Sequence, residues 1–369
     1  MKVGILTSSR ADFGIYLPLV KKLFEDDFFR PEIIAFGTHL SQKFGMTIGE
    51  IENEGFPVRH KLQTMPDDDT PLSIAHSISK TIGSFSEFWN NNQFDLVFAL
   101  GDRFEMLAAV LAGSPFNVTF AHIHAGETTL GAIDNSYRHG ISLMSDIMFV
   151  STDEYKQRAI EITNRPGDVY NIGALSIDNL KNVKLFSVKK FYGQYKIDLT
   201  KPTILSTFHP ETVNYEKNIL YINELLGAFD SLKERYQIII TMPNADTMGM
   251  QIRDRIEKYS IDKNNIVLVE SLGMKGYLSC MKHCKFMIGN TSSGFVEAAF
   301  FPKYVINLGK RQEGRILTPN IFSIPIKATS ILNTVGEIEK LPEPSPNNIY
   351  GDGETARKIV EILKKKHHV

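Results

Sequence analysis

The chain has 369 residues, and at about 150 residues per domain this length suggests two domains. Its 43% hydrophobic and 22% charged residues are typical of globular proteins and exclude a disordered chain or a small disulfide scaffold. The 41 Lys and Arg residues are balanced by 42 Asp and Glu residues, which argues against a nucleic-acid-binding protein because such proteins usually carry a basic surplus.

The first half of the chain alternates short apolar runs with longer amphipathic stretches. The runs predict strands at 2–9, 31–39, 94–102 and 118–127, and the stretches predict helices at 16–28, 70–92, 104–114 and 135–146. A further strand followed by a helix is expected within 147–162. Strands that alternate with helices indicate βαβ units and a parallel sheet, with ligands near the carboxyl ends of the strands.

A polar, Lys-rich segment at 182–201 interrupts this alternation, and we place the domain junction near it. The alternation then resumes, with strands expected at 202–210, 236–244, 265–271, 285–292 and 304–309 and helices at 215–235, 250–260, 276–284 and 293–301. The expected domains are 1–180 and 190–350, both Rossmann-like, with an interdomain cleft. Residues 351–369 form a basic amphipathic helix that packs back on the N-terminal domain.

Neither the cysteines nor the apolar runs point to export or a membrane. A zinc site would need more ligands than Cys280, Cys284 and the neighbouring His283, so we expect two reduced thiols and no metal. The apolar run at the N-terminus is too short for a secretion signal, and no window reaches the roughly 20 apolar residues of a membrane span. We expect a cytoplasmic protein without membrane contact.

Two polar side chains follow predicted strands of the first domain. Arg10 comes directly after the first strand, where its planar guanidinium could bind a phosphate or carboxylate in the cleft, or pair with a nearby acid. Asp102 ends the third strand, and it is either a helix N-cap or an acid/base group.

The densest group of titratable side chains lies between residues 121 and 140. It contains His122, His124, Glu127, Asp134, Arg138 and His139. Such a group suits proton transfer, although the His-x-His spacing also permits a metal site, because alternation along a strand directs both imidazoles to one face. Asp134 as the cap of a helix beginning at Asn135 is the alternative to a catalytic role.

The second domain carries a candidate anion site. Residues 289–294, Gly-Asn-Thr-Ser-Ser-Gly, lie between a strand and a helix, where Ser292, Ser293 and Gly294 could hold phosphate oxygens and Glu297 could accept from ribose hydroxyls. His209 ends another strand and is a candidate for charge stabilisation. The chain has neither a P-loop nor a GxGxxG motif after its first strand, which disfavours a nicotinamide dehydrogenase.

Five motifs taken in this order resemble the UDP-N-acetylglucosamine 2-epimerase family: SSRADFG, GDRFEM, HIHAGETTLGAIDNSYRH, GNTSSGFVEA and RQEGR. The central motif is most similar to the hydrolysing branch, which supplies sialic-acid-type sugar synthesis. The resemblance implies two Rossmann-like domains in a glycosyltransferase-B arrangement, a UDP-sugar in the cleft, and no metal or cofactor. It also implies a homodimer or homotetramer.

The reaction implied by this resemblance begins with removal of the C2 proton and loss of UDP, which gives a 2-acetamidoglucal. Addition of water then releases N-acetylmannosamine and UDP. The family positions make Asp102 and Asp134 candidates for proton transfer, and Glu127 joins them by proximity. They place Arg10 and His209 near the diphosphate, Ser292, Ser293 and Gly294 on phosphate oxygens, Glu297 on the ribose, and Arg315 and Asn244 in the nucleotide pocket.

One departure and one choice of substrate stay open. Some relatives carry an acid at the position of His124, so either His124 or Glu127 takes that role. The expected substrate is UDP-N-acetylglucosamine, with UDP-N,N′-diacetylbacillosamine of the legionaminic acid pathway as the alternative. A non-hydrolysing epimerase, a retaining glycosyltransferase and a nucleotide-sugar sensor are the competing functions.

Overall fold

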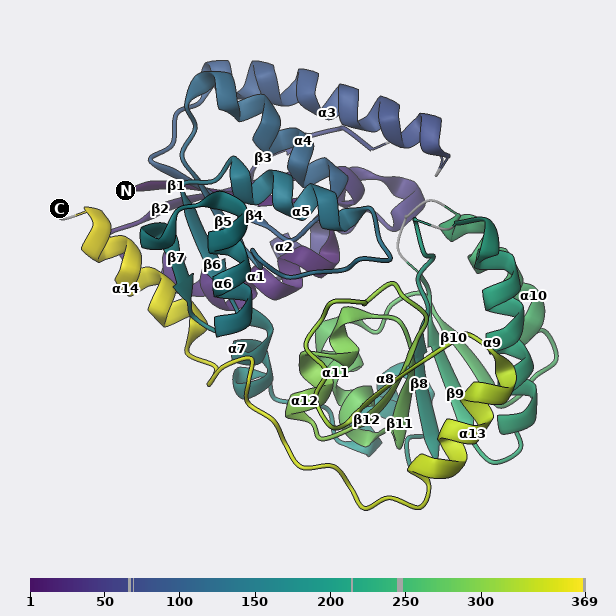
Figure 1. Cartoon of the computed structure of the whole chain (residues 1–369). Helices are drawn as coiled ribbons and strands as arrows, with labels where there is room; N and C mark the ends of the chain where they lie inside the picture. The colour runs from purple at the N-terminus through teal and green to yellow at the C-terminus, as the bar shows by residue number, and fades with distance from the viewer. Residues whose placement is uncertain (66–67, 69, 214, 244–247, 368–369) are drawn as a thin grey trace. The chain divides into compact units, whose positions relative to one another are not determined.

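The computed structural model describes residues 1–65, 68, 70–213, 215–243 and 248–367, which divide into two units (Figure 1). Unit 1 comprises residues 1–127, 134–181 and 349–369, and unit 2 comprises residues 128–133 and 182–348. Each unit is built on a parallel sheet. Among the described residues, no helix is both long and apolar enough to span a bilayer.

Unit 1 has a seven-stranded sheet in the order β3-β2-β1-β4-β5-β6-β7. Its strands are β1 (Lys2–Thr7), β2 (Arg30–Phe36), β3 (Val58–Leu62), β4 (Leu96–Leu100), β5 (Phe120–Ile123), β6 (Ile147–Val150) and β7 (Val169–Asn171). Its helices are α1 (Arg10–Phe24), α2 (Ile48–Asn53), α3 (Pro71–Asn91), α4 (Phe104–Gly113), α5 (Asp134–Leu143), α6 (Asp153–Thr163), α7 (Leu175–Asn182) and α14 (Thr355–His367). The C-terminal helix α14, yellow in Figure 1, contacts α1.

Unit 2 has a six-stranded sheet in the order β10-β9-β8-β11-β12-β13. Its strands are β8 (Thr203–Thr207), β9 (Gln237–Thr241), β10 (Ile266–Val269), β11 (Phe286–Gly289), β12 (Tyr304–Leu308) and β13 (Ile321–Ile324). Its helices are α8 (Val188–Tyr195), α9 (Asn218–Leu232), α10 (Gly249–Ser260), α11 (Gly273–His283), α12 (Glu297–Phe300) and α13 (Ala328–Ile338).

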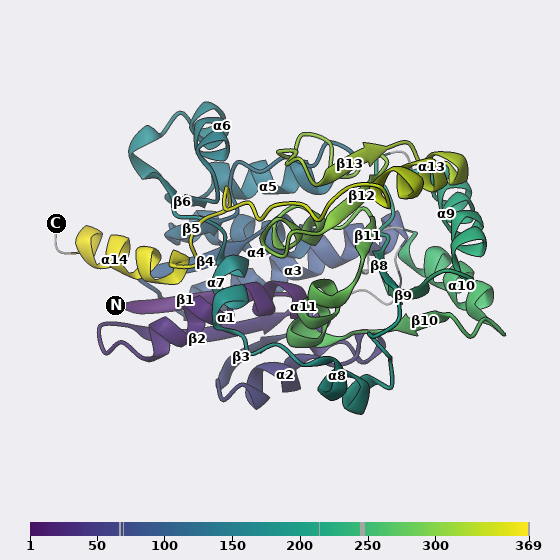
Figure 2. The same cartoon turned by 90° about the horizontal axis from the view of Figure 1, so that it is seen from below.

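Helices cover both faces of the unit 2 sheet, as Figure 2 shows from a second direction. Along β8, Ile204 joins a core cluster with α9, α10 and α13, whereas Leu205 joins a cluster with α8, α11 and α12. Successive side chains of a strand point to opposite faces, so a sheet covered on both faces needs apolar residues at every position. This explains the uninterrupted apolar runs of the second half.

Helix α1 begins at Arg10, six residues before the predicted helix. Ser9 and Asp12 form a reciprocal capping box that fixes this start. The helix also runs through Pro18, which has no N–H to donate to the carbonyl oxygen of Gly14. Asn179 of α7 donates to that oxygen at 2.7 Å instead, so the proline is accommodated within the helix.

Two other predictions of elements need correction. The segment at 182–201 is not simply a polar junction, because Ser187 caps α8 inside it and Phe191 of α8 is buried. The single helix expected at 293–301 is instead a 3-10 turn, η6 (Ser292–Gly294), followed by the four-residue helix α12. The short strands β3, β7 and β13 lie outside every predicted run.

Each sheet has one point at which its strand order reverses direction. In unit 1 this point lies between β1 and β4, and in unit 2 between β8 and β11. Ligands of open α/β sheets bind beyond the carboxyl ends of the strands at such points. These ends lead into Arg10 and Asp102 in unit 1, and into His209 and residues 290–294 in unit 2.

Candidate functional site

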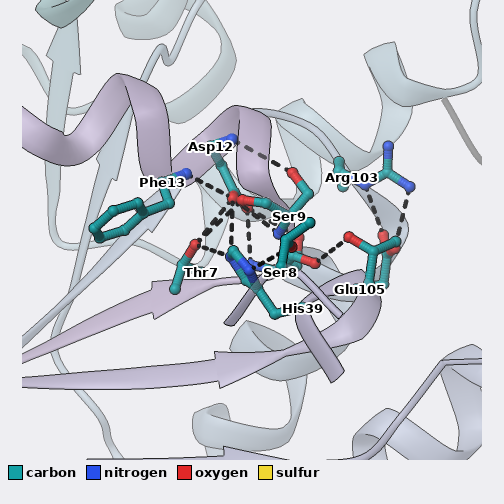
Figure 3. Close-up of polar contacts among 10 residues, drawn as sticks. Thr7, Ser8, Ser9, Asp12, Phe13, His39, Arg103 and Glu105 are labelled. Carbon is teal, nitrogen blue, oxygen red and sulfur yellow. Dashed lines mark hydrogen bonds and ion pairs between the residues drawn. The ribbon is translucent and has the colours of Figure 1, made fainter. Parts of the chain in front are cut away.

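A buried polar network holds the turn between β1 and α1 (Figure 3). One oxygen of Asp12 accepts from the Thr7 hydroxyl and from the backbone N–H groups of Ser9 and Phe13 at 2.8–2.9 Å. The other accepts from the backbone and hydroxyl of Ser8 at 2.8 and 3.0 Å. The carboxylate therefore fixes the backbone that presents Arg10.

His39 extends this network to Thr47. Its Nε2 lies 2.9 Å from the Thr7 hydroxyl, and its Nδ1 lies 2.9 Å from the Thr47 hydroxyl. Since Thr7 gives its single proton to Asp12, His39 must donate from Nε2 and accept at Nδ1. Burial lowers the pKa of His39, which favours the neutral form of the ring. Sequence reasoning missed Asp12 and His39, although Ser9-x-x-Asp12 is a recognisable capping box.

Arg10 itself is partly exposed at the first position of α1. Its Nη1 lies 3.9 Å from a carboxylate oxygen of Glu50, a long and weak ion pair. Surface pairs of this kind contribute at most about 1 kcal/mol, so the guanidinium can exchange this partner for a ligand at little cost. The structure thus places Arg10 at the β1 end, with Asp102 following the neighbouring strand.

Arg138 links the first-domain candidates to one another. Its side chain is buried on α5, where Nη2 donates to Asp102 and Nη1 donates to the backbone oxygen of His124 at 3.0 Å. The same Nη1 lies 3.7 Å from Glu127. A buried guanidinium requires such partners, and it gathers Asp102, His124 and Glu127 around one positive charge.

His124 and Glu127 form the centre of this cluster. The His124 Nδ1 lies 3.1 Å from Oε1 of Glu127, whose side chain is only 1% exposed. Ser151 also donates to that oxygen at 3.4 Å. Asp134 is the first residue of α5 and lies four residues before Arg138, so the two side chains occupy the same face of the helix.

Beside the cluster, Arg103 donates from Nε and Nη2 to the two oxygens of the buried Glu105, both at 3.1 Å (Figure 3). This pair, which sequence reasoning did not single out, lies at the start of α4. Arg103 follows Asp102 directly, so the pair fixes the backbone between the end of β4 and the start of α4.

His122 is a structural residue and not a partner of His124. The strand β5 ends at Ile123, and His124 has a positive φ of 69°, so strand alternation does not place the two imidazoles on one face. His122 Nε2 lies 2.8 Å from the Gly101 carbonyl oxygen, and Nδ1 lies 2.9 Å from the Ser142 hydroxyl. It thereby fixes the backbone just before Asp102.

Burial lowers the pKa of His122 to about 3, far below its ordinary value of 6.5. Between these values the unfolded chain binds a proton that the folded chain does not, so stability falls as the pH falls. We expect this residue alone to remove about 2 kcal/mol of stability between pH 7.5 and pH 5. Urea unfolding across this range should show a flatter pH dependence for His122→Gln; equal slopes would contradict the buried neutral state.

In unit 2, a chain of hydrogen bonds joins three motifs that are distant in sequence. The backbone N–H of His209 donates to the Asn290 side chain at 2.7 Å, and that side chain donates back to His209 O at 2.8 Å. Gln312 donates to the backbone oxygen of Asn290 at 2.8 Å and accepts from Arg315 Nε at 2.6 Å. His209 and Arg315 thus meet through Asn290 and Gln312, which sequence reasoning had not assigned.

The candidate phosphate segment does not have the geometry expected of a helix N-terminus, because α12 is only four residues long. Ser292 is exposed, and Ser293 lies 2.6 Å from the buried hydroxyl of Tyr277. Gly294 is buried, and a Cβ there would lie 2.9 Å from Val305. Glu297 begins α12 and is half-buried. The 3-10 turn therefore offers its hydroxyls as donors, while Gly294 packs against β12.

Residues 128–133 belong to unit 2, although they lie between Glu127 and α5 of unit 1. The backbone N–H of Leu130 donates to the Glu313 carbonyl at 2.9 Å, and that of Ile133 donates to the Thr212 hydroxyl at 2.9 Å. At Gly131, a Cβ would lie 2.3 Å from the backbone oxygen of Lys310. Only glycine permits this approach.

The remaining candidates can be placed briefly. Asn244 lies outside the described residues. Cys280 and Cys284 are buried and free, and burial raises the pKa of both thiols. Over the part of the chain that the structure describes, no three His, Cys, Asp or Glu side chains come together in a way that could hold a metal ion.

Comparison with known proteins identifies the family. The family model described as UDP-N-acetylglucosamine 2-epimerase matches residues 21–364. The chain belongs to the UDP-N-acetylglucosamine 2-epimerase family. The structure is similar to the crystal structure of UDP-GlcNAc 2-epimerase from Neisseria meningitidis bound to UDP-GlcNAc, with a TM-score of 0.85 and 19% identity over 99% of this chain and 100% of that chain. This similarity confirms the predicted fold of two parallel α/β domains.

Relatives of this family member that exceed 30% identity include the following three proteins. The GDP/UDP-N,N′-diacetylbacillosamine 2-epimerase (hydrolyzing) of Campylobacter jejuni is 36% identical over 88% of this chain and 84% of its own. The polysialic acid biosynthesis protein P7 of Escherichia coli is 33% identical over 98% and 93%. The UDP-N,N′-diacetylbacillosamine 2-epimerase (hydrolyzing) of Legionella pneumophila is 31% identical over 98% and 95%.

Proposed function

We propose that this epimerase-family enzyme is a hydrolysing 2-epimerase that converts a UDP-2-acetamido sugar and water into UDP and the free 2-epimeric sugar. The observation that carries the proposal is the cluster of Asp102, His124 and Glu127 around the buried Arg138. A C2 proton is weakly acidic, so its removal needs a positioned base in a site whose charges are already arranged.

Each unit carries candidate groups for such a substrate. In unit 1, Asp102 and Asp134 would transfer protons at the sugar, and Arg10 would bind the diphosphate. In unit 2, His209 would also face the diphosphate, Ser292 and Ser293 would bind phosphate oxygens, Glu297 would accept from the ribose, and Arg315 and Asn244 would complete the nucleotide site. The long Arg10–Glu50 pair and the exposed Ser292 support these roles, because both are accessible to a ligand.

We further propose UDP-N,N′-diacetylbacillosamine as the preferred substrate, which reverses the order suggested by the motifs. Two of the relatives described above carry this sugar in their names. UDP-N-acetylglucosamine is the second candidate, because the family is described by it and a Neisseria meningitidis relative of that name is 26% identical. The product would supply the synthesis of legionaminic or sialic acids, and the homodimer or homotetramer implied by the family stays a prediction.

Proton NMR in D2O, with each UDP-sugar in turn, tests the reaction and the substrate together. We expect UDP and a free sugar that has inverted at C2 and carries deuterium there, formed faster from the diacetylbacillosamine nucleotide. An epimer that keeps its UDP would indicate a non-hydrolysing epimerase. Transfer that depends on an added acceptor would indicate a glycosyltransferase, and binding without turnover would indicate a sensor.

A further inference from the structure

His124 has an unusual backbone and an unpaired imidazole nitrogen. Its φ of 69° is uncommon for a residue with a Cβ. Two hydrogen bonds of its backbone stabilise this conformation, because its N–H donates to Phe149 O and its carbonyl oxygen accepts from Arg138, both at 3.0 Å. Nε2 is buried and has no hydrogen-bond partner among the described residues. A buried polar atom without a partner costs free energy, so its retention in a charged cluster points to a use.

Glu127 has the opposite surroundings. Its side chain is 1% exposed, whereas that of His124 is 13% exposed. One of its oxygens lies 3.1 Å from His124 Nδ1 and accepts from Ser151, and the other lies 3.7 Å from Arg138 Nη1. Both carboxylate oxygens therefore contact groups of the protein. Glu127 could contact a sugar carbon only if these interactions were broken.

We infer that Nε2 of His124 is the base that removes the C2 proton, and that Glu127 is a positioning residue that orients and charges this imidazole. The inference rests on the proposed function and resolves which of the two residues acts on the substrate. An ionised carboxylate only accepts hydrogen bonds, so Nδ1 of His124 carries the proton that faces Glu127. In the neutral ring, Nε2 is then the atom with a free lone pair.

The chemical step balances with these groups. Nε2 takes the C2 proton, the C2–H electron pair forms the C1=C2 bond, and the C1–O bond breaks so that UDP leaves with its electron pair. The resulting imidazolium lies against the Glu127 carboxylate. In the second step, the C1=C2 electron pair takes a proton at C2 from the opposite face, and water bonds to C1 through its oxygen. The proton that this water loses passes to a carboxylate. Asp102 and Asp134 are available, one to give the C2 proton and the other to accept the proton from water.

The decisive experiment measures UDP release and deuterium incorporation at C2, with the full-length protein and the better UDP-sugar. His124→Gly should lower kcat by about 10³-fold while UDP binding, measured by calorimetry, is retained, and added imidazole should restore at least tenfold. His124→Gln should be as inactive and should not respond to imidazole. His60→Gln, which alters a His–Glu pair (2.8 Å to Glu32) on β3, should keep wild-type activity.

Glu127→Gln separates positioning from catalysis. The charged and titratable groups around His124 are Glu127 on its own loop, Arg138 from α5 and His122 from β5. Loss of the carboxylate removes the charge that stabilises the imidazolium formed in the step, so kcat should fall while KM stays close to the wild-type value. We expect kcat to fall by about 10²-fold without complete loss of exchange at C2.

Three outcomes would overturn the inference. His124 variants that keep activity within tenfold of wild type would remove the residue from the chemistry. A folded, UDP-binding His124→Gly that imidazole does not restore would make its role structural. Loss of all exchange in Glu127→Gln, with exchange retained in His124→Gln, would make Glu127 the base. Failure of the wild-type protein to turn over either sugar would instead overturn the proposed function itself.

Discussion

Asp102→Asn is expected to lower kcat by about 10³-fold, the larger part of what one acid/base group contributes. The substitution keeps the shape of the side chain but removes the charge that faces Arg138, and an amide cannot exchange a proton with the sugar. Asp102 is 27% exposed, so unlike Glu127 it retains access to a ligand. Coupled measurement of UDP release gives kcat directly.

The matched control for this substitution is Asp95→Asn. Asp95 lies just before β4 and accepts from the backbone N–H of Lys2 at 2.6 Å, whereas Asp102 follows the same strand at its other end. The control should keep wild-type kcat, and both variants should bind UDP to within about threefold of wild type. Near-normal turnover by Asp102→Asn would show that the carboxylate takes no part in proton transfer.

Gly126→Ala should have the largest effect on stability, about 3 kcal/mol of unfolding free energy. Gly126 has a φ of 72°, and a Cβ there would lie 2.1 Å from the backbone oxygen of Tyr155. The left-handed backbone conformation and the close contact with Tyr155 both destabilise a variant with a Cβ at this position. Relief of the clash would shift Glu127, the next residue, so kcat should fall together with the urea midpoint.

Gly83→Ala provides a control of opposite sign. Gly83 lies inside α3 of the same unit, and a Cβ there would meet nothing within 4 Å. Alanine is favoured over glycine within a helix by about 1 kcal/mol, so this variant should be slightly more stable than wild type and fully active. If Gly126→Ala unfolds at the wild-type urea concentration, the close approach to Tyr155 is not rigid.

Periodicity identified most of the secondary structure, because a parallel sheet buried on both faces produces long apolar runs. Periodicity did not predict the bounds of elements that are determined by specific hydrogen bonds. The start of α1 is set by the Ser9–Asp12 capping box, and the helix accommodates Pro18 through Asn179, a residue 165 positions from Gly14. The brevity of α12 and the short strands β3, β7 and β13 likewise lack a periodic signal of sufficient length.

The candidate site was predictable as a set of residues but not as a set of interactions. The density of titratable groups at 121–140 indicated this loop as the candidate site, yet nothing in the sequence shows that Arg138 joins Asp102 to Glu127. Nor could alternation show that His122 and His124 have different partners, since the strand ends between them. Asn290 and Gln312 were missed because their hydrogen bonds connect segments far apart in the chain.

The placement of residues 128–133 within unit 2 bears on how enzymes of this kind can be recombined. A fragment that begins at residue 182 lacks six residues of its own unit and leaves the Glu313 carbonyl and the Thr212 hydroxyl without the partners they have in the whole chain. Grafting unit 2 of one relative onto unit 1 of another therefore requires two separate stretches of sequence. The shorter of them must be inserted directly between Glu127 and Asp134.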